Sequence, residues 1–520
     1  MIRNRMRLLA IGVAGMGLLG ASLVTDVRPA LAGPASCANR VNNTHEKLQE
    51  CVTVEGVRAH QQAFQAIADA NGGIRAAGTP GYEASVQYVV DTATAAGYNV
   101  SKNAFQFVFV ALPTLQQIAP SPGTYETGAF TGTGYGTVIA AVTAVDINLT
   151  PPRASTSGCE PGDFAGFPAG NIALVQRGAC TFAMKALNAA NVGASAVIIF
   201  NQGNTPARED LIVGTLAPST VAIPVVGASF ANGVALSQAG STARINVDPP
   251  QNITQYNVIA ESKDGNPDNV VMAGAHLDSV LRGPGINDNG SGSAVLLELA
   301  THMAKVKPVN KLRFAWWGAE ESGLVGSNAY VNGLSAADQA KIALYLNFDM
   351  VGSPNHVFFV YDGDDSDGIG APAGPPGSAQ IEKAFEAFYN SRGIPFKGTD
   401  FSGRSDYGRF IAVGIPAGGL FTGAEGIKTA DEAAQWGGTA GQQYDPCYHL
   451  ACDTFANNNL SALDVNADAV AFSVLQFAMN TSGINAVRGK GNFPNVGGTG
   501  GQPGGTSSGE FDHWTIRPTE

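Results

Sequence analysis

The spacing of apolar residues changes along the chain and divides it into regions. Between residues 57 and 100 apolar residues recur at helical spacing on both sides of the Gly-Thr-Pro-Gly turn at 78–81, which predicts two helices. From about 120 to 250, short β-branched runs alternate with Gly, Pro and Ser turns. Within this stretch we expect a helix at 182–191 and a buried strand at 196–200.

After residue 250 the pattern changes to fully apolar strands that alternate with helices. Strands are expected at 270–276, 311–318 and 344–351, with a helix at 291–305. Strands that are apolar on both faces must be covered on both sides. The pattern therefore predicts an α/β fold with a mixed, mostly parallel central sheet flanked by helices.

The first 32 residues have the features of a secretory signal peptide. Three arginines precede an uncharged apolar run at 8–24, and Pro-Ala-Leu-Ala follows at 29–32. A membrane anchor is the alternative, but 17 residues is at the lower limit for a span. We expect cleavage after Ala32, a secreted protein and no membrane association.

Composition narrows the functional classes. A formal charge of −12 and only 14% charged residues give no electrostatic footprint for nucleic acid. A hydrophobic content of 44% excludes intrinsic disorder, and six cysteines suit an exported enzyme with three disulfides. From about residue 488 to 520 the chain is rich in Gly, Pro and Ser, which predicts a flexible tail.

Ionisable residues follow the apolar strands, at the edge of an α/β sheet where ligands gather. His276 and Asp278 end the first strand, Glu320 and Glu321 follow the second, and Asp349 follows the third. A Gly-rich loop with a further aspartate opens the helix at 291, and a histidine lies between two cysteines near 450. Imidazoles and carboxylates at successive strand ends predict a metal site.

Five candidate ligands are too many for one tetrahedral zinc ion that also holds water. If one aspartate bridges, each of two ions receives three protein ligands and shares the water. Nitrogen and oxygen ligands suit zinc best, with Co²⁺ or Mn²⁺ as substitutes. These candidates are His276, Asp288, Glu321, Asp349 and His449.

Adjacent glutamates in extended backbone point to opposite sides, so Glu320 and Glu321 cannot share one task. One of them binds metal, and the other is free to move a proton between water and the leaving amine.

Five ordered motifs resemble those of the M28 zinc aminopeptidases, especially secreted leucine-type members. The resemblance covers about 57–110 and 252–485. The motifs are His-Leu-Asp-Ser at 276–279, Asn-Asp-Asn-Gly-Ser-Gly at 287–292, Trp-Gly-Ala-Glu-Glu at 317–321, Asn-Phe-Asp-Met at 347–350 and Tyr-His at 448–449.

The resemblance implies a role for each ligand. His276 and Asp349 would hold one zinc, Glu321 and His449 the other, and Asp288 would bridge them.

The same resemblance implies the catalytic and substrate-binding residues. Glu320 would be the general acid/base, and Tyr448 would donate a hydroxyl to the oxyanion. Glu320 and Asp349 would receive the α-amine of the substrate, and Arg404 would orient it. The residues implied to line an apolar pocket are Gly403, Phe421 and Met350.

The sequence Val-Gln-Arg-Gly-Ala-Cys-Thr-Phe at 175–182 resembles a protease-associated (PA) domain. We therefore expect a catalytic domain at 33–119 and 251–487, with a small β-rich PA domain inserted at 120–250. A packing role and a role as a cover over the site both remain open for this insertion.

Proximity and the resemblance together suggest three disulfides, Cys37–Cys51, Cys159–Cys180 and Cys447–Cys452. Relatives place calcium at a pair equivalent to Asp464 and Asp468, together with an acidic residue near the mature N-terminus. Cys51 stands at that last position here, which weakens the expectation of calcium.

The sequence thus predicts a secreted, monomeric two-zinc aminopeptidase that acts on peptides with a free N-terminus and prefers large apolar first residues. Three alternatives remain. A single-zinc glutaminyl cyclase would bind one ion, a receptor-like ectodomain would lack ligands, and a carboxypeptidase would need a basic pocket for a C-terminal carboxylate.

Overall fold

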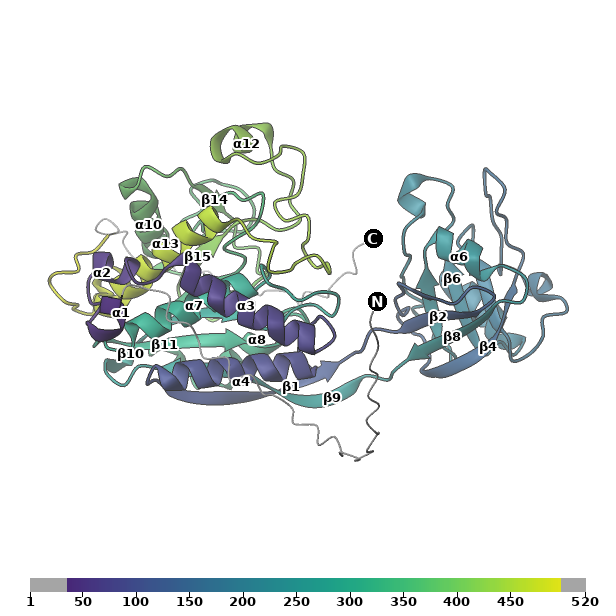
Figure 1. Cartoon of the computed structure of the whole chain (residues 1–520), viewed down its shortest axis with the longest axis horizontal. Coiled ribbons are helices and arrows are strands. Elements are labelled where there is room, and N and C mark those ends of the chain that lie inside the picture. The colour runs from purple at the N-terminus through teal and green to yellow at the C-terminus, as the bar shows by residue number, and fades with distance from the viewer. Residues whose placement is uncertain (1–34, 497–520) are drawn as a thin grey trace, which may run out of the picture.

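A computed structural model describes residues 35–496, which form two lobes joined by a ribbon (Figure 1). The ribbon consists of β1 (Asn99–Phe109) and β9 (Gln251–Glu261), paired antiparallel along their whole length from Asn99 opposite Glu261 to Phe109 opposite Gln251. The predicted signal peptide and the tail beyond residue 496 lie outside the described residues.

The larger lobe is built on an eight-stranded sheet with the order β1-β9-β11-β10-β12-β15-β13-β14. Its four central strands are parallel, and the ribbon strands pair antiparallel at one edge, so the predicted mixed, mostly parallel sheet is confirmed. The strands beyond the ribbon are β10 (Asn266–His276), β11 (Asn310–Trp317), β12 (Ile342–Phe348), β13 (Phe359–Tyr361), β14 (Lys397–Thr399) and β15 (Ala417–Phe421).

Helices bury both faces of this sheet. Along β10, Val271 and Ala273 belong to the main core, whereas Val270 and Met272 belong to a second core on the opposite face. On the main-core face lie α2 (His45–Gln49), α3 (Val54–Ala70), α4 (Pro80–Ala95), α7 (Gly290–Met303), α10 (Ser378–Ser391), α13 (Leu460–Met479) and α14 (Ser482–Asn485). The short α1 (Ala35–Asn39) precedes α2. The remaining helices of this lobe are α8 (Val325–Gly333), α9 (Ala336–Gln339), α11 (Gly408–Ala412) and α12 (Ala430–Trp436).

Within residues 35–496, α13 is the one helix long and apolar enough to cross a membrane, but 78% of its apolar window is buried. It packs in the main core. Its length and composition therefore reflect its place as a core helix.

The smaller lobe is a seven-stranded sheet with the order β3-β2-β8-β4-β5-β6-β7. The predicted helix at 182–191 and strand at 196–200 are confirmed as α5 and β6. The elements of this lobe are β2 (Thr114–Ala119), β3 (Gly123–Tyr125), β4 (Gly136–Ala144), β5 (Ile172–Gln176), α5 (Phe182–Asn191), β6 (Ala196–Phe200), β7 (Val225–Ala228), α6 (Phe230–Leu236) and β8 (Thr242–Val247), with short 3₁₀ turns at Pro161–Phe164 and Pro206–Arg208.

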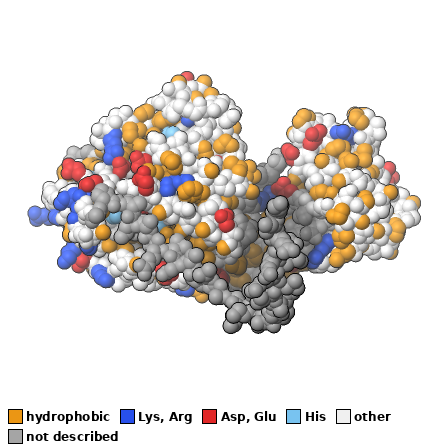
Figure 2. All heavy atoms as spheres, viewed as in Figure 1, with side chains coloured by type: hydrophobic (Ala, Val, Ile, Leu, Met, Phe, Trp, Pro, Cys, Tyr) orange, Lys and Arg blue, Asp and Glu red, His pale blue; other side chains and the backbone are white. Residues whose placement is uncertain are grey.

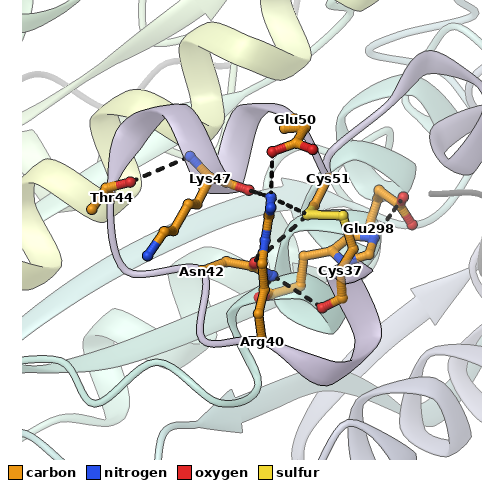
Figure 3. The surroundings of a disulfide bond; sticks show 9 residues. Cys37, Arg40, Asn42, Thr44, Lys47, Glu50, Cys51 and Glu298 are labelled. Atoms are coloured by element: carbon orange, nitrogen blue, oxygen red, sulfur yellow. Dashed lines mark hydrogen bonds and ion pairs between the residues drawn. A yellow bond between two sulfur atoms is a disulfide. The ribbon is translucent and has the colours of Figure 1, made fainter. Parts of the chain in front are cut away.

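Three disulfides form with the predicted pairing. Cys37–Cys51 closes the N-terminal arm around α1 and α2, where Arg40 pairs with Glu50 at 2.7 Å (Figure 3). The Asn42 side chain donates a hydrogen bond to the carbonyl of His302 at 2.9 Å. This arm is therefore fastened both to itself and to the end of α7.

A buried carboxylate on the same helix lies between two histidines. Glu298 is 3.1 Å from His302 and 3.5 Å from His60, whose other ring nitrogen contacts the Tyr88 hydroxyl at 2.7 Å. A Cβ at Gly56 would lie 1.9 Å from a Glu298 oxygen, so only glycine allows this approach. Burial raises the pKa of Glu298, but the hydrogen bonds from both histidines outweigh it, and the net pKa is lowered.

The lowered pKa predicts how Glu298 contributes to stability. A depressed folded-state pKa stabilises the fold above the unfolded value of 4.5, and the contribution is lost as pH falls through the folded value. We expect Glu298→Gln to lower the free energy of unfolding at pH 7 by about 1–3 kcal/mol. Thermal melts from pH 7 to 3 should show the two proteins converging on the acid side.

The control is Glu83→Gln, which alters an exposed glutamate on the neighbouring α4. A difference between wild type and Glu298→Gln that stays constant with pH would contradict the prediction.

Candidate metal centre

Three parallel strands deliver their C-terminal ends to one edge of the large sheet. His276 is the last residue of β10 and pairs in register with Trp317, the last residue of β11. Asn347 of β12 pairs with Gly274 on the other side of β10. The loops that carry the predicted ligands therefore start from the same edge, as the sequence predicted.

The strand expected at 344–351 ends earlier than predicted, at Phe348. Met350 has a positive φ of 53°, which is incompatible with a continuing strand. Asp349 therefore lies in the turn just beyond the sheet, not inside the strand.

The first ligand group forms around His276. Its Nε2 atom lies 3.2 Å from Asp349 Oδ1, 3.1 Å from Asp288 Oδ1 and 4.0 Å from Glu320 Oε2. His276, Glu320 and Asp349 offer atoms close enough together to hold one metal ion.

The second group forms around His449. Its Nε2 atom lies 3.0 Å from Glu321 Oε2 and 3.4 Å from Asp288 Oδ2. Asp288 thus presents one oxygen to each histidine, and Glu320 and Glu321 belong to different groups. The bridging role of Asp288 stays a prediction, and Glu320, which was predicted to remain free of metal, is one of the three possible ligands of the first group.

Backbone conformations that are rare for non-glycine residues cluster at these groups. Ala319, Met350 and His449 have positive φ values of 55°, 53° and 59°. The first precedes Glu320, the second follows Asp349, and the third is itself a candidate ligand. Such strain persists where the surroundings impose it, and it is typical of functional sites.

Neighbouring groups also fix the orientation of the His276 ring. Its Nδ1 lies 3.1 Å from the carbonyl oxygen of Asp278, so Nε2 is the nitrogen that faces Asp288 and Asp349. One carboxylate oxygen of Asp278 accepts a hydrogen bond from the Glu320 backbone at 3.2 Å. Asp278 therefore connects the loop after β10 to the loop after β11.

Asp453, which the sequence analysis did not identify, ties the second histidine's loop to the bridging aspartate. Its two oxygens accept the backbone N–H groups of Asn287 at 2.8 Å and Asp288 at 2.9 Å. Asp453 directly follows the Cys447–Cys452 disulfide that closes the loop of His449. The only local feature that could have pointed to Asp453 is its position directly after Cys452.

Arg75 is a second residue that the sequence analysis missed. Its guanidinium is completely buried and donates to the carbonyls of Leu277, Pro284 and Gly285, which belong to the loop between His276 and the bridging aspartate. Burial lowers the pKa of Arg75 to about 10, while nearby carboxylates oppose that shift. The residue therefore places a positive charge directly behind the ligands.

The carboxylates of the site are crowded and poorly compensated. Burial, helped by Asp288, raises the pKa of Glu321 to about 7, and burial raises that of Glu320 well above its usual range. For His449, burial lowers the pKa, but Asp288 and Glu321 outweigh it and raise the pKa to about 10. Glu321 Oε1 is buried without a hydrogen-bond partner. A divalent cation bound by nitrogen and oxygen ligands fits this donor set.

The predicted substrate residues lie on neighbouring segments. The Tyr448 ring stacks on His449 with centroids 3.8 Å apart, and burial raises the pKa of its hydroxyl. Arg404 forms a 2.6 Å ion pair with Glu425, a partner that the sequence analysis did not identify. Met350 accepts a hydrogen bond from the residue after Phe421, so these two predicted pocket residues are adjacent. Gly403 donates its backbone N–H to the Tyr407 hydroxyl at 2.9 Å.

The predicted calcium ligands Asp464 and Asp468 both lie on α13. Asp468 is paired with the Arg392 guanidinium at 2.7 Å. Burial raises the pKa of Asp468 to about 6 despite that pairing. A cation at this position would compete with an arginine.

Two imidazoles and four carboxylates gathered at one edge of a sheet form a set of side chains that could bind metal ions for hydrolysis. The model of peptidase family M28 matches residues 257–474, and that of the PA domain matches 140–236. An aminopeptidase of Pseudomonas aeruginosa is 48% identical over 504 residues, 93% of each chain. The chain belongs to peptidase family M28, as its motifs predicted.

Other relatives agree with this assignment. A probable lipoprotein aminopeptidase of Mycobacterium tuberculosis is 42% identical over 481 residues, covering 89% of this chain and 91% of that one. The solved aminopeptidase from Aneurinibacillus sp. strain AM-1 is 30% identical, with a TM-score of 0.51 and coverage of 83% and 96%. A zinc aminopeptidase from Bacillus subtilis, 24% identical with a TM-score of 0.57 and coverage of 82% and 96%, shares the fold. The chain is a metallo-aminopeptidase with an inserted PA domain.

The crowding of buried carboxylates predicts that metal ions stabilise the fold. Removal of bound ions by a chelator should lower the melting temperature, because four carboxylates then repel one another. An ion present at about 100 times its dissociation constant contributes about 2.7 kcal/mol of stability. Calorimetry before and after chelation, followed by readdition of zinc, measures this contribution.

Magnesium at the same concentration serves as the control, because it binds nitrogen-containing sites poorly. A melting temperature that does not respond to chelation, in protein shown to contain metal beforehand, would contradict the prediction.

Proposed function

We propose that the protein is a secreted two-zinc aminopeptidase that releases large apolar residues such as leucine from peptides with a free N-terminus. The observation that carries this proposal is the position of Asp288, with one oxygen toward each histidine-centred group. The relatives named leucine aminopeptidase support the side-chain preference. One of them, from Trichophyton rubrum, is 44% identical over 337 residues.

The proposal assigns each metal ligand a place. His276 and Asp349 would hold one ion and Glu321 and His449 the other, and Asp288 would be shared, since its Oδ1 faces His276 and its Oδ2 faces His449. Zinc, when bound, lowers the pKa of a water molecule and polarises the peptide carbonyl. The disulfide and Asp453 keep His449 at the correct distance from the bridging carboxylate.

Glu320 is the proposed general acid/base. It lies beside His276 but at 4.0 Å, farther away than Asp349 or Asp288. Burial raises its pKa, so its carboxyl group holds a proton more readily than an exposed glutamate does. Glu320 takes a proton from the attacking water and passes it to the leaving amine.

The substrate's α-ammonium group is proposed to bind between Glu320 and Asp349. A positive charge at this position partly neutralises the carboxylates, and an internal peptide bond carries no such charge. Tyr448 donates its hydroxyl to the developing oxyanion, and Arg404 orients the substrate. Gly403, Met350 and Phe421 form the apolar pocket for the first side chain.

Secretion and the domain boundaries belong to the proposal as well. Three disulfides form and persist in oxidising compartments, in agreement with the predicted signal peptide. The catalytic domain would span 33–119 and 251–487, with the PA domain at 120–250. An ion pair of 3.1 Å between the exposed side chains of Glu126 and Arg282 joins the small lobe to the loop after His276.

The two glutamates should respond differently to mutation. Glu320→Gln preserves shape and both metal ions but removes the proton carrier, so kcat should fall by about 10²–10⁴-fold. Glu321→Ala removes a ligand, so one of the two ions should be lost. Metal analysis of each purified variant, together with kcat on leucine p-nitroanilide, distinguishes the two roles. Metal loss in Glu320→Gln with both ions retained in Glu321→Ala would reverse the assignment.

The free α-amine should decide which substrates are cleaved. Acetylation removes its charge and leaves the facing carboxylates without a partner, at a cost of about 2–5 kcal/mol. This corresponds to a loss of roughly 30- to several-thousand-fold in kcat/KM. The measurement compares leucine p-nitroanilide with its N-acetyl form at equal zinc and enzyme. Comparable rates would identify an endopeptidase or a general amidase instead.

A further inference from the structure

The two adjacent glutamates of the candidate metal centre lie on a short loop that is closed at its base. This glutamate loop begins at Gly318, directly after β11, and ends at Gly326 in the first turn of α8. The backbone N–H of Gly326 donates to the carbonyl of Gly318 at 3.0 Å, which brings the two ends of the loop together. The positions of Glu320 and Glu321 therefore depend on this pair of glycines, the neck of the loop.

One buried side chain of the ribbon binds both sides of the neck. Asn257 of β9 accepts the backbone N–H of Gly318 through Oδ1 at 3.0 Å, and its amide nitrogen donates to the carbonyl of Gly326 at 2.9 Å. The same nitrogen donates to Asn103 Oδ1 at 3.0 Å. A backbone N–H can only donate and a carbonyl can only accept, so these partners fix the orientation of the Asn257 amide.

Glycine at both ends of the loop lets the ribbon approach it closely. A Cβ at Gly326 would clash with Asn257 Oδ1, and a Cβ at Gly318 would clash with the Tyr82 hydroxyl. Tyr82 donates that hydroxyl to the carbonyl of Tyr256, the neighbour of Asn257 on β9, at 2.7 Å. Asn257 and Tyr82 are both completely buried. Larger residues at the neck would therefore push the loop and the ribbon apart.

Asn257 lies at the point where the ribbon leaves the large sheet. β9 pairs with β11 from Glu261 to Val258, and Asn257 is the next residue toward the small lobe. Its side chain, in place of its backbone, makes the next contact with the segment that follows β11. Asn103 stands directly opposite it on β1. The amide thus connects both strands of the ribbon to the neck of the loop.

Aromatic packing adds to the same connection. Phe105 and Phe107 of the ribbon belong to one buried hydrophobic cluster with Ala319. Ala319 has a positive φ of 55° and immediately precedes Glu320. A conformation of this kind persists where the surroundings impose it. The ribbon supplies part of those surroundings.

We propose that Asn257 is a positioning residue for the two glutamates, and that through it the ribbon sets where the glutamate loop stands relative to His276 and His449. Asn257 belongs to neither ligand group, so it acts through the loop that it binds at both ends. This inference rests on the proposed two-zinc function. It adds to that function a residue and a physical connection to the strands that lead to the small lobe.

The sharpest test is Asn257→Asp, which keeps the size of the side chain but places an oxygen where the amide now donates to Gly326. The neck should open, and kcat on leucine p-nitroanilide should fall by about 10- to 100-fold. KM should stay near the wild-type value, because the proposed pocket residues lie on other segments. Chelator competition should show about 10- to 100-fold weaker binding of one zinc ion only, since Glu321 lies on this loop and His276 and Asp349 do not.

Three further variants accompany this test. Asn257→Ala should give the same pattern. Asn103→Ala removes only the hydrogen bond across the ribbon, so the pattern should be the same but smaller. The matched control is Gln106→Ala, which alters an exposed side chain that donates to Thr254 across the same ribbon at 3.3 Å. This control should leave kcat and zinc affinity unchanged.

A folded Asn257 variant with wild-type kcat and zinc affinity would overturn the positioning role, and so would equal weakening of both zinc sites. If neither Asn257 variant folds, Asn103→Ala decides, and wild-type values there would overturn the role. Wild-type values in Asn103→Ala beside an impaired Asn257→Asp would overturn the part assigned to the ribbon. A wild type that binds fewer than two ions would instead refute the proposed two-zinc function itself.

Discussion

Electrostatic repulsion among buried carboxylates is the constraint around which the larger lobe is arranged. Glu320, Glu321, Asp349 and Asp288 meet at one sheet edge with two histidines between them. Such a group can persist only if the backbone holds it and positive charge compensates it. The strained turns, the short disulfide loop and the buried guanidinium of Arg75 all serve these two needs. The fold supplies the rigidity, and bound cations would supply the charge.

Much of the site could be predicted because its ligands follow short, local patterns. Each candidate ligand stands at or within a few residues of a strand end, so an apolar run followed by His276 or by Glu320 and Glu321 was sufficient to locate the edge of the sheet. The α/β class followed from strands that are apolar on both faces, as β10 shows with Val271 and Val270 in different cores. Local sequence carries this kind of information well.

The residues that support the site could not be predicted in the same way, because folding brings each of them to the site from a distant part of the chain. Asp453 accepts a hydrogen bond from the backbone of Asp288, 165 positions earlier. Ser405 donates one to the carboxylate of Asp349, 56 positions earlier. Ser405 has no strand end or charge to distinguish it from other serines. The strand expected at 344–351 also ran past the end of β12, because Met350 and Val351 are apolar and the left-handed turn at Met350 has no local signal. Tertiary packing, not local preference, determines these features.

The ribbon of β1 and β9 has a consequence for how such a protein can evolve. Because Phe109 lies directly opposite Gln251, the two ends of the inserted segment are neighbours in a regular antiparallel pair. A turn of a few residues could close that pair into an ordinary hairpin and leave the large sheet intact. The small lobe stands beside the larger one as a separate unit (Figures 1 and 2). It could therefore be gained, lost or exchanged in evolution without rebuilding the sheet that carries the candidate metal ligands.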